Sequence, residues 1–504
     1  CQIMQILHDP IAIRNWPPPR GCRYSARTPH KSTKTTPMTT RLEHDLLGDR
    51  EVPAHAYWGV HTLRAIENFP ITGQTIASYG DLIRALAVIK QAAALANHQL
   101  GLLADHHKEA IVLACEEIRA GKLHDQFVVD VIQGGAGTST NMNANEVIAN
   151  RALELLGHGK GEYQHLHPNE HVNMGQSTND VYPTALRLAT FWGVQRLLAA
   201  MARLRDAFDD KADEFADVLK MGRTQLQDAV PMTLGQEFRT YAVMLGEDEQ
   251  RLYEASALML EINLGATAIG TGITAHPDYT PLVCQKLSAL TGLALETAPN
   301  LIEATQDCGA FVQLSGVLKR VAVKLSKSCN DLRLLSSGPR AGLGEINLPA
   351  RQAGSSIMPG KVNPVIPEVV TQVAYEVIGN DMTVTMAAEA GQLQLNAFEP
   401  VIAYSLFRSV SHLAAACDTL RENCVVGITA NRDYLLDTVH RSVGLVTALN
   451  PYIGYAAATE VATEAHQSGG SVYDIVLRRG LLTREQLDTV LQPAALTSPR
   501  WLTL

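Results

Sequence analysis

The sequence predicts an all-α protein built as an elongated bundle of long helices. Along several stretches the apolar side chains recur at steps of three and four residues, which marks one face of an α-helix. Stretches that alternate like β-strands, with hairpin turns between them, are scarce. Helices of about thirty residues would be roughly 45 Å long. Patterns of this length without internal capping signals are typical of bundles with coiled-coil-like packing.

Residues 41–180 are expected to form an N-terminal domain of shorter helices and loops. One helix should start at Asp81, an N-cap candidate, and end near Gly101. Residues 181–430 should form a central long-helix bundle domain, because they carry all of the long apolar patterns. These patterns cover residues 183–220, 235–263, 311–332, 367–400 and 402–424.

Residues 431–504 are expected to form a small C-terminal helical domain, in which Thr483 and Gln486 make a capping box at the start of a short helix. An elongated bundle cannot bury all of its apolar stripes within one chain, so helices from several subunits should share one core. We therefore expect a homotetramer, a closed arrangement that suits such a bundle.

Residues 1–40 differ in composition from the rest of the chain. They begin with Cys1, contain six Lys or Arg side chains and are rich in Pro, Ser and Thr. A transit peptide has such a composition, but residues 17–40 show no amphipathic period. The interpretation we favour is a disordered or non-native extension, translated from a misplaced start upstream of a natural start at Met38.

Composition and charge restrict the classes of protein to which the chain can belong. Of its 504 residues, 46% are hydrophobic and 18% are charged, as in ordinary globular proteins. The net charge of −9 argues against nucleic-acid binding, and no apolar run approaches the roughly 20 residues that cross a bilayer. The eight cysteines lack the paired spacing of disulfide frameworks or zinc sites. We expect a cytoplasmic protein without nucleic-acid or membrane partners.

Four polar loops carry side chains that could do chemistry, and residues 354–364 are the most informative of them. This loop combines Gly and Pro with two serines, a lysine and an asparagine. It could be a mobile connector, since Gly and Pro punctuate most loops. The polar set favours a catalytic flap instead, because Ser, Lys and Asn can take a proton and hold a carboxylate.

Residues 134–146 place glycines and hydroxyl side chains ahead of a helix start. The loop lacks the lysine of a P-loop and the spacing of a dinucleotide site, so a phosphate site is weakly supported. An anion site, in which free N–H groups and Thr138 hold a carboxylate, fits better. A helix start capped by Asn or Thr explains the same residues equally well.

Residues 171–180 place Gln, Ser, Thr, Asn and Asp just before a long helix. One of them suffices for an N-cap, so the excess favours binding. Residues 222–233 lie between two long helical patterns, where a plain connector between helices is the simplest interpretation. Their density of hydrogen-bonding side chains exceeds what a connector needs, which again favours a binding role.

All four loops, and most of the chain from Arg41 to Pro493, resemble the aspartase/fumarase superfamily. The sequence Gly-Ser-Ser-Ile-Met-Pro-Gly-Lys-Val-Asn-Pro at residues 354–364 is similar to that superfamily's signature loop and is highly specific. The resemblance implies a homotetramer around a twenty-helix core, with each active site built from three subunits. It also implies small dicarboxylate substrates and catalysis with no cofactor and no metal.

Within the superfamily, the chain resembles the branch that releases ammonia from L-aspartate more than the branch that hydrates fumarate. Residues 45–48, 50–54 and 59–69 are similar to the start of ammonia-releasing members. Residues 135–138 are Gly-Ala-Gly-Thr where fumarases have Ser-Gly-Thr, and Gln225 stands where fumarases have His. Gln225 removes an ionisable contact with substrate, but other ammonia-releasing members also have Gln there.

The resemblance also implies roles for the loop residues. Ser355 would be the base that removes the proton from Cβ of the substrate, leaving an aci-carboxylate. Lys361 or loop N–H groups would activate Ser355, or Lys361 would instead anchor a carboxylate. Ser356 would bind substrate or set the loop geometry. The donors to the developing charge would be Thr138, Ser177, Thr178 and Thr224, while Asn179 and Asn363 would hold further substrate groups.

Two alternatives to an ammonia-lyase remain open. One is a class-II fumarate hydratase of the same fold. The other is a non-catalytic structural tetramer, since members of this superfamily have been recruited as lens crystallins. The presence of Ser355, Lys361 and Asn363 argues against the second alternative, because a purely structural copy does not need them.

Overall fold

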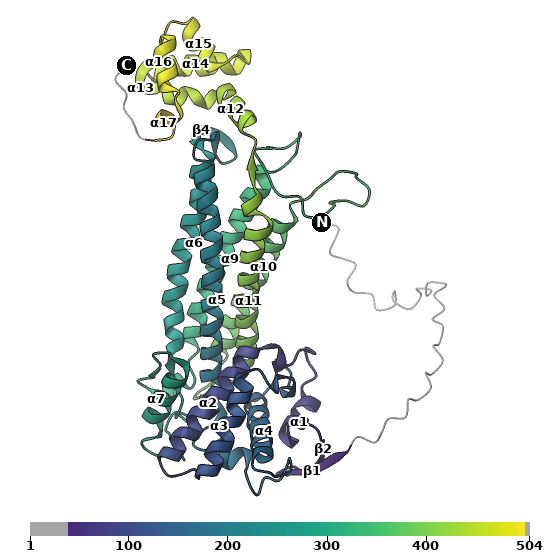
Figure 1. Ribbon diagram of the computed structural model, residues 1–504. Coiled ribbons are helices and arrows are strands. Elements are labelled where there is room, and N and C mark those ends of the chain that lie inside the picture. Colours follow the sequence, from purple (N-terminus) through teal and green to yellow (C-terminus); the bar gives the residue numbers. More distant parts are fainter. Residues whose placement is uncertain (1–38, 499–504) are drawn as a thin grey trace, which may run out of the picture.

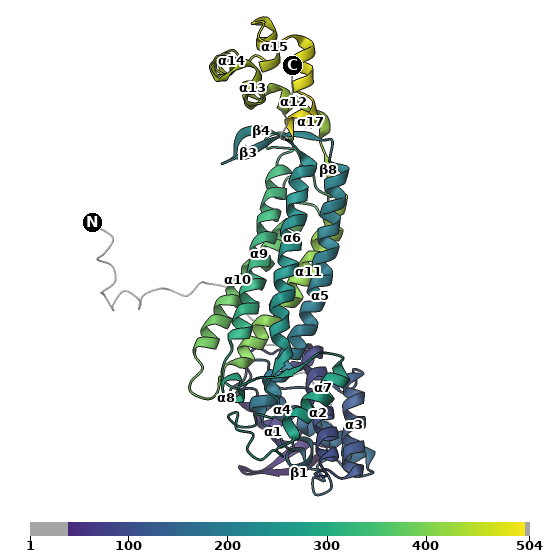
Figure 2. The same cartoon turned by 90° about the vertical axis from the view of Figure 1, so that its left-hand side faces the viewer.

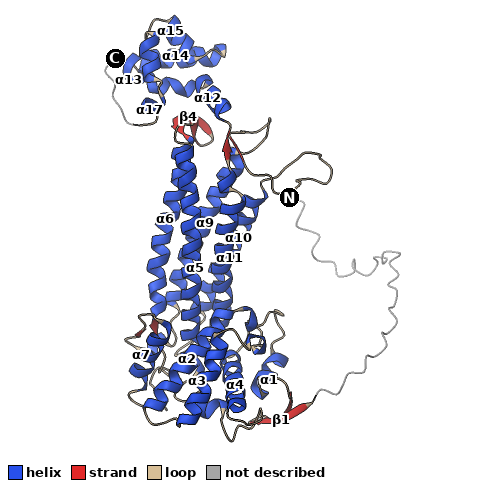
Figure 3. Ribbon diagram, in the orientation of Figure 1, coloured by secondary structure: helices blue, strands red, loops and turns tan. Residues whose placement is uncertain are grey.

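In the computed structural model, which describes residues 39–498, five long helices run side by side as a tall shaft (Figure 1). The N-terminal region lies at one end of the shaft and the C-terminal region at the other, also after a quarter turn (Figure 2). Helices dominate, and the described strands form four two-stranded sheets (Figure 3). The predicted all-α class and elongated bundle are confirmed. Of the predicted extension at residues 1–40, residues 1–38 lie outside the described residues, and Thr40 begins the first strand.

The apolar stripes predicted from the sequence line the core of the shaft. Leu204 of α5, Leu325 of α9 and Leu413 of α11 belong to one buried cluster that runs along all five helices. The shaft helices are α5 (Thr178–Glu214), α6 (Leu234–Ala257), α9 (Gly309–Leu335), α10 (Val365–Glu389) and α11 (Glu399–Asn423). Three of the patterns run past the helix that they predict. The pattern over 183–220 continues beyond α5 into a strand, the pattern over 235–263 continues beyond the end of α6 at Ala257, and the pattern over 367–400 crosses the gap between α10 and α11.

The first shaft helix, α5, begins five residues before the predicted start and contains Pro183. A proline inside a helix leaves the carbonyl four residues earlier without its usual N–H donor. Here that carbonyl belongs to Asn179, and Nδ2 of Asn263 donates to it at 3.0 Å. Ser177 caps the helix in a capping box with Asp180. The polar segment 171–180 therefore leads directly into the N-terminus of α5.

The N-terminal region packs short helices around a second apolar core. Asp81 does not cap α2 as predicted. It lies in the first turn, and the N-cap position is taken by Tyr79 without a side-chain hydrogen bond. The elements of this region are β1 (Thr40–Asp45), β2 (Gly48–Pro53), α1 (Val60–Asn68), η1 (Ile76–Ser78), α2 (Gly80–Gln99), α3 (Asp105–Arg119), η2 (His124–Gln126), α4 (Thr138–Leu155), η3 (Pro168–Val172), η4 (Leu258–Leu260), β5 (Glu261–Ile262), α7 (Tyr279–Thr291), β6 (Glu296–Thr297) and α8 (Leu301–Ala304).

A β-hairpin, and not a plain helix–helix connector, joins α5 to α6. Its strands are β3 (Leu219–Thr224) and β4 (Gln227–Thr233). The two turn residues, Gln225 and Leu226, have φ values of 54° and 63°, as a tight two-residue hairpin turn requires. The prediction missed the hairpin because neither turn residue is the usual Gly or Asn.

The C-terminal region caps the far end of the shaft with a small core of its own. The predicted capping box is confirmed, since Thr483 Oγ1 accepts from the backbone N–H of Gln486 and the Gln486 side chain accepts from that of Thr483. The elements here are β7 (Ile346–Asn347), η5 (Val425–Gly427), β8 (Thr429–Ala430), α12 (Arg432–Arg441), η6 (Val443–Leu449), α13 (Asn450–Ile453), α14 (Tyr455–Ser468), α15 (Val472–Arg478), α16 (Arg484–Val490) and α17 (Pro493–Leu496). Across residues 39–498, no helix has the length and apolar character to cross a membrane.

Candidate active site

The residues expected to carry chemistry fall into two groups at opposite ends of the shaft. Thr138, Ser177, Thr178 and Asn179 lie at the N-terminal end of α5. Thr224 and the loop 354–364 lie beyond its C-terminal end, in the stretches next to β3 and α10. The helix between the two groups is 37 residues long, or roughly 55 Å. One chain therefore does not bring the two groups together.

The first group forms where the N-termini of α4 and α5 meet. Gly137 precedes α4 with a φ of 88°, and a Cβ there would lie 2.4 Å from the ring of Tyr182 on α5, so only glycine allows this approach. Nδ2 of Asn141 on α4 donates to Thr178 Oγ1 at 3.1 Å. The hydroxyl of Thr138 donates to the carbonyl of Gly135 at 2.8 Å. No Asn or Thr side chain caps α4, contrary to one interpretation of residues 134–146.

These two helix starts make a site suited to an anion. Helix N-termini present free N–H groups and the positive end of the helix dipole. Ser177 and Thr178 add hydroxyl groups at the same place, with Ser177 half-buried and Thr178 buried. A carboxylate of a small substrate could be held there without a metal or a cofactor.

A buried lysine beneath this site was missed by the sequence prediction. Lys90 of α2 is fully buried, and its Nζ donates to Asn173 Oδ1 at 2.8 Å. Asn141 Nδ2 donates to the same oxygen at 3.2 Å, which links the lysine to the residue that contacts Thr178. Burial lowers the pKa of Lys90 to about 7. The signal was present in the sequence, because Lys90 interrupts a run of apolar residues on α2.

The loop after β5 supports the start of α5. Asp180 is buried, and its Oδ2 accepts from the N–H groups of Gly265 at 3.0 Å and Thr267 at 2.9 Å. Burial outweighs these donors and raises the pKa of Asp180 to about 6. Asn179 Nδ2 donates to the carbonyl of Ala268 at 2.7 Å, so in this conformation its amide hydrogen faces the loop.

The second group centres on the loop 354–364, which is closed by its own hydrogen bonds. The N–H of Gly354 donates to the carbonyl of Lys361 at 2.7 Å, and Nδ2 of Asn363 donates to the carbonyl of Gly354 at 2.7 Å. Ser355 Oγ accepts from the N–H groups of Ile357 at 3.2 Å and Met358 at 3.0 Å. Two such donors would stabilise a negative charge on this oxygen.

The loop leaves its cation and its apolar side chains exposed. Lys361 and Ser356 are exposed, and within the described part of the chain the ammonium group of Lys361 has no hydrogen-bond or ion-pair partner. The side chain of Ile357 is 83% exposed. The loop therefore presents a free ammonium group and an apolar surface that this chain does not cover.

Thr224 lies exposed at the tip of the hairpin, beside Gln225. Two charged side chains of β3 hold the hairpin in place. Lys220 Nζ and Arg223 Nη1 contact the carboxylate oxygens of Glu345 at 2.7 Å and 2.5 Å. Glu345 directly precedes β7, so the same anchor holds the hairpin and the segment that leads to the loop 354–364.

Sequence comparisons place the chain among known proteins. The profile of a family described as "Lyase" matches residues 48–379, and that of "Fumarase C C-terminus" matches residues 445–498. The chain belongs to this lyase family. The resemblance to the aspartase/fumarase superfamily is thereby confirmed.

Relatives within the lyase family are similar along nearly their whole length. The aspartate ammonia-lyase of Helicobacter pylori strain J99 is 60% identical, over 91% of this chain and 98% of that protein. The aspartate ammonia-lyase of Escherichia coli K12 is 57% identical, over 92% of this chain and 97% of that protein. Among solved structures, "fumarate lyase:delta crystallin" of Brucella melitensis bound to cobalt has 56% identity and a TM-score of 0.90, covering 92% of this chain and all of that one. The class II fumarase of Schistosoma mansoni has 35% identity and a TM-score of 0.86, covering 90% of this chain and 98% of its own.

Proposed function

We propose that the chain is an aspartate ammonia-lyase, which converts L-aspartate to fumarate and ammonia. The observation that carries this proposal is identity of 57–60% to proteins of that name over more than nine tenths of both chains. The class II fumarase of similar fold is only 35% identical, which favours the ammonia-releasing reaction over hydration of fumarate.

In the proposed reaction, Ser355 takes a proton from Cβ of aspartate and its hydroxyl is re-formed. The electron pair of the broken C–H bond moves into the adjacent carboxylate, which then carries two negative oxygens. When that pair returns, it forms the double bond of fumarate, and the C–N bond breaks with its electrons leaving on ammonia. The N–H groups of Ile357 and Met358 support the required serine alkoxide.

The groups that would hold the substrate come from both ends of the shaft. The hydroxyls of Thr138, Ser177, Thr178 and Thr224 would donate to the developing charge, with Asn179 and Lys361 holding the remaining polar groups of the substrate. The side chain of Asn363 also donates to the carbonyl of Gly354, so Asn363 helps to hold the shape of the loop 354–364. Ser356, exposed beside the base, would contact substrate from the solvent side.

We further propose that the protein is a homotetramer whose active sites combine residues from three chains. The separation of roughly 55 Å between the two groups supports this, because an antiparallel neighbour would bring its loop 354–364 to the N-terminal end of the first chain's α5. Exposed apolar side chains on α10 also support it, and they are Tyr375, Ile378, Met382 and Met386.

A cytoplasmic location is part of the same proposal. All six cysteines of the described residues are free and buried. Free thiols of this kind fit a reducing compartment.

The proposed reaction is tested by supplying the purified protein with L-aspartate or with L-malate and following fumarate by its ultraviolet absorbance. We expect fumarate from L-aspartate and at most a trace from L-malate. Fumarate from L-malate alone would make the protein a fumarate hydratase. No product from either substrate, with an intact tetramer, would make it a structural protein.

The shared site is tested by co-expressing two inactive variants, Ser355→Ala and Thr178→Val. If each site takes these residues from different chains, random assembly restores about a quarter of the sites in mixed tetramers. If one chain supplied both residues, every site would keep a defect and the mixture would stay inactive. Each variant expressed alone is the matched control.

A further inference from the structure

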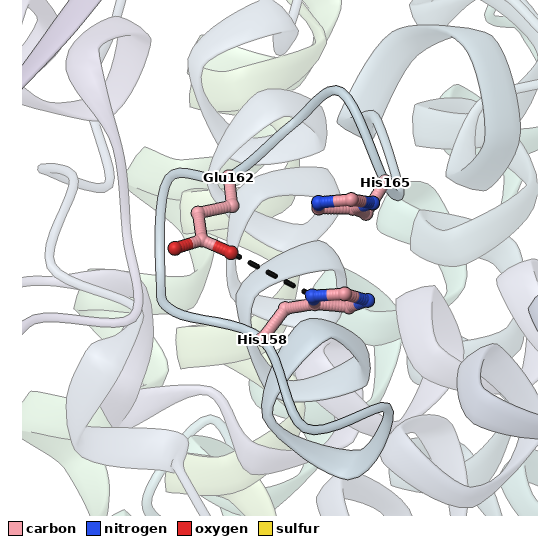
Figure 4. Close-up of side chains that lie close together, drawn as sticks. All are labelled: His158, Glu162 and His165. Atoms are coloured by element: carbon pink, nitrogen blue, oxygen red, sulfur yellow. Dashed lines mark ion pairs between the residues drawn. The ribbon is translucent and has the colours of Figure 1, made fainter.

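A cluster of metal-ligating side chains lies in the loop that connects α4 to η3. It consists of His158, Glu162 and His165, which we call the 158–165 cluster (Figure 4). The cluster follows the C-terminal end of α4, whereas Thr138 opens that helix, so α4 separates the cluster from the candidate active site by roughly 27 Å. The proposed reaction uses none of these three residues.

The three side chains converge on one space. The two imidazole rings stack with centroids 3.8 Å apart and planes 6° from parallel. His158 Nδ1 lies 3.6 Å from Glu162 Oε2, which is too long for a good hydrogen bond. One ligand atom from each residue lies within 4.8 Å of the other two. Figure 4 shows a nitrogen of each ring on the side that faces the Glu162 carboxylate.

The backbone that carries the cluster is fixed by hydrogen bonds. Oδ1 of Asn150 on α4 accepts from the N–H of Gly161 at 2.8 Å, and Gly161 has a φ of 85° that favours glycine. The N–H of His165 donates to the carbonyl of Glu162 at 3.0 Å. His107 Nε2 donates to the carbonyl of His165 at 2.8 Å. The three ligands are thus presented from a loop whose ends and middle are held in place.

The nearest lysine of the same loop does not compete for Glu162. Lys160 Nζ lies 3.4 Å from Glu154 and 3.9 Å from the centre of the Tyr57 ring. Glu162 is therefore left with the two imidazoles. Two imidazole rings and a carboxylate that no lysine or arginine of the described residues contacts form an arrangement that suits a shared cation.

We propose that His158, Glu162 and His165 bind one divalent transition metal ion, such as Zn²⁺. Two imidazole nitrogens and one carboxylate oxygen form a ligand set that suits Zn²⁺ and Co²⁺ better than Mg²⁺ or Ca²⁺, which prefer oxygen ligands. Metal–ligand distances of about 2.0–2.2 Å would draw the three side chains closer together. Three protein ligands leave further positions to water, because the cluster is open to solvent. The ion would join both ends of the loop between α4 and η3.

The proposal is tested on the full chain after removal of metals with a chelator. Calorimetric titration with Zn²⁺ should give one strong site per chain that is lost in the double variant His158→Gln with His165→Gln. Glu162→Gln should weaken binding by roughly tenfold or more, because it removes the charge of one of the three proposed ligands. The matched control is His466→Gln, an exposed histidine of α14 at the far end of the molecule, which should bind as the parent does.

Two further measurements separate a metal site from a merely structural cluster. Co²⁺ bound to the parent should give visible absorption bands that the double variant lacks. Zn²⁺ should raise the unfolding temperature of the parent but not that of the double variant, since a ligand that binds only the folded state stabilises it. Equal Zn²⁺ binding by the parent and the double variant would overturn the proposal, as would absence of binding by the parent. Neither measurement depends on fumarate formation, so its result is independent of the test of the proposed reaction.

Discussion

At the scale of single residues, the environment of Ser355 differs from that of an ordinary nucleophilic serine. Such serines are usually activated by an adjacent side-chain base. Ser355 Oγ instead accepts from two backbone N–H groups of its own loop, while Lys361 is exposed close by in sequence. Backbone donors stabilise an alkoxide without requiring a second titratable group. The sequence alone could name the serine, but only the loop conformation shows these donors.

Replacing Ser355 tests its role as the base. We expect Ser355→Ala to lose nearly all turnover, because methyl cannot accept the Cβ proton, while the tetramer and the unfolding temperature stay unchanged. Initial rates of fumarate formation and sedimentation velocity measure the two effects. Retention of most of the parent's kcat by a correctly assembled variant would show that another group takes the proton.

Glu399 gives a prediction about pH. Burial raises the pKa of this carboxyl from its ordinary value of 4.5 to about 8. Between these two values the unfolded chain has released the proton and the folded chain keeps it, so the free energy of unfolding falls as pH rises and levels off above about pH 8. Glu399→Gln should remove this part of the pH dependence.

The measurement is the unfolding temperature of parent and variant between about pH 5 and about pH 9. The stability of Glu399→Gln relative to the parent should increase with pH across this window. Glu389→Gln, at an exposed position of α10, is the control and should follow the parent. A constant difference between Glu399→Gln and the parent at every pH would contradict the prediction.

At the scale of elements, the long helices were largely predictable and the loops were not. Apolar spacing located α5, α6, α9, α10 and α11, because a buried stripe must repeat with the helical period. Spacing could not place the start of α5, where a side chain distant in sequence, Asn263, satisfies the carbonyl that Pro183 leaves free. It also could not show the β3–β4 hairpin, whose turn residues adopt positive φ without being Gly or Asn. The proposed division at residues 180 and 430 stays a prediction.

The loop 354–364 depends on a glycine at its first position. A Cβ at Gly354 would lie 2.7 Å from the carbonyl oxygen of Lys361, which is the oxygen that Gly354 itself binds. Gly354→Ala should therefore open the loop and reduce kcat strongly, with little change in unfolding temperature, because the loop is not part of the core. Steady-state kinetics and thermal unfolding check this. Gly246→Ala on α6, where a Cβ meets only an ordinary contact, is the control.

At the scale of the whole molecule, α10 carries an exposed apolar face that the described part of the chain does not cover. Met382 and Met386 are 62% and 66% exposed and lie one turn apart. We expect the double variant Met382→Glu with Met386→Glu to lose the tetramer, because burying two carboxylates without partners is costly. Loss of the tetramer should abolish activity, since the two groups of site residues would then stay apart.

Sedimentation velocity measures this outcome directly. The parent should sediment as four times the 54.6 kDa chain, and the double variant as a smaller species. Leu46→Glu, at a 95% exposed position in the β1–β2 turn, is the control and should remain tetrameric. A tetrameric, active double variant would place the subunit contacts on another face.

The sequence by itself determined the helical class, the shaft and the four polar segments that carry the candidate site residues, because helical period and polar composition are local properties of the chain. Only the tertiary structure decided where these segments lie relative to one another. The length of α5 separates Thr178 from Ser355, and packing brings the buried Lys90 beneath the first group. It also brings His158 and His165 into a stack with Glu162 beside them. Such distances depend on which elements pack together, and a local pattern in the chain does not contain that information.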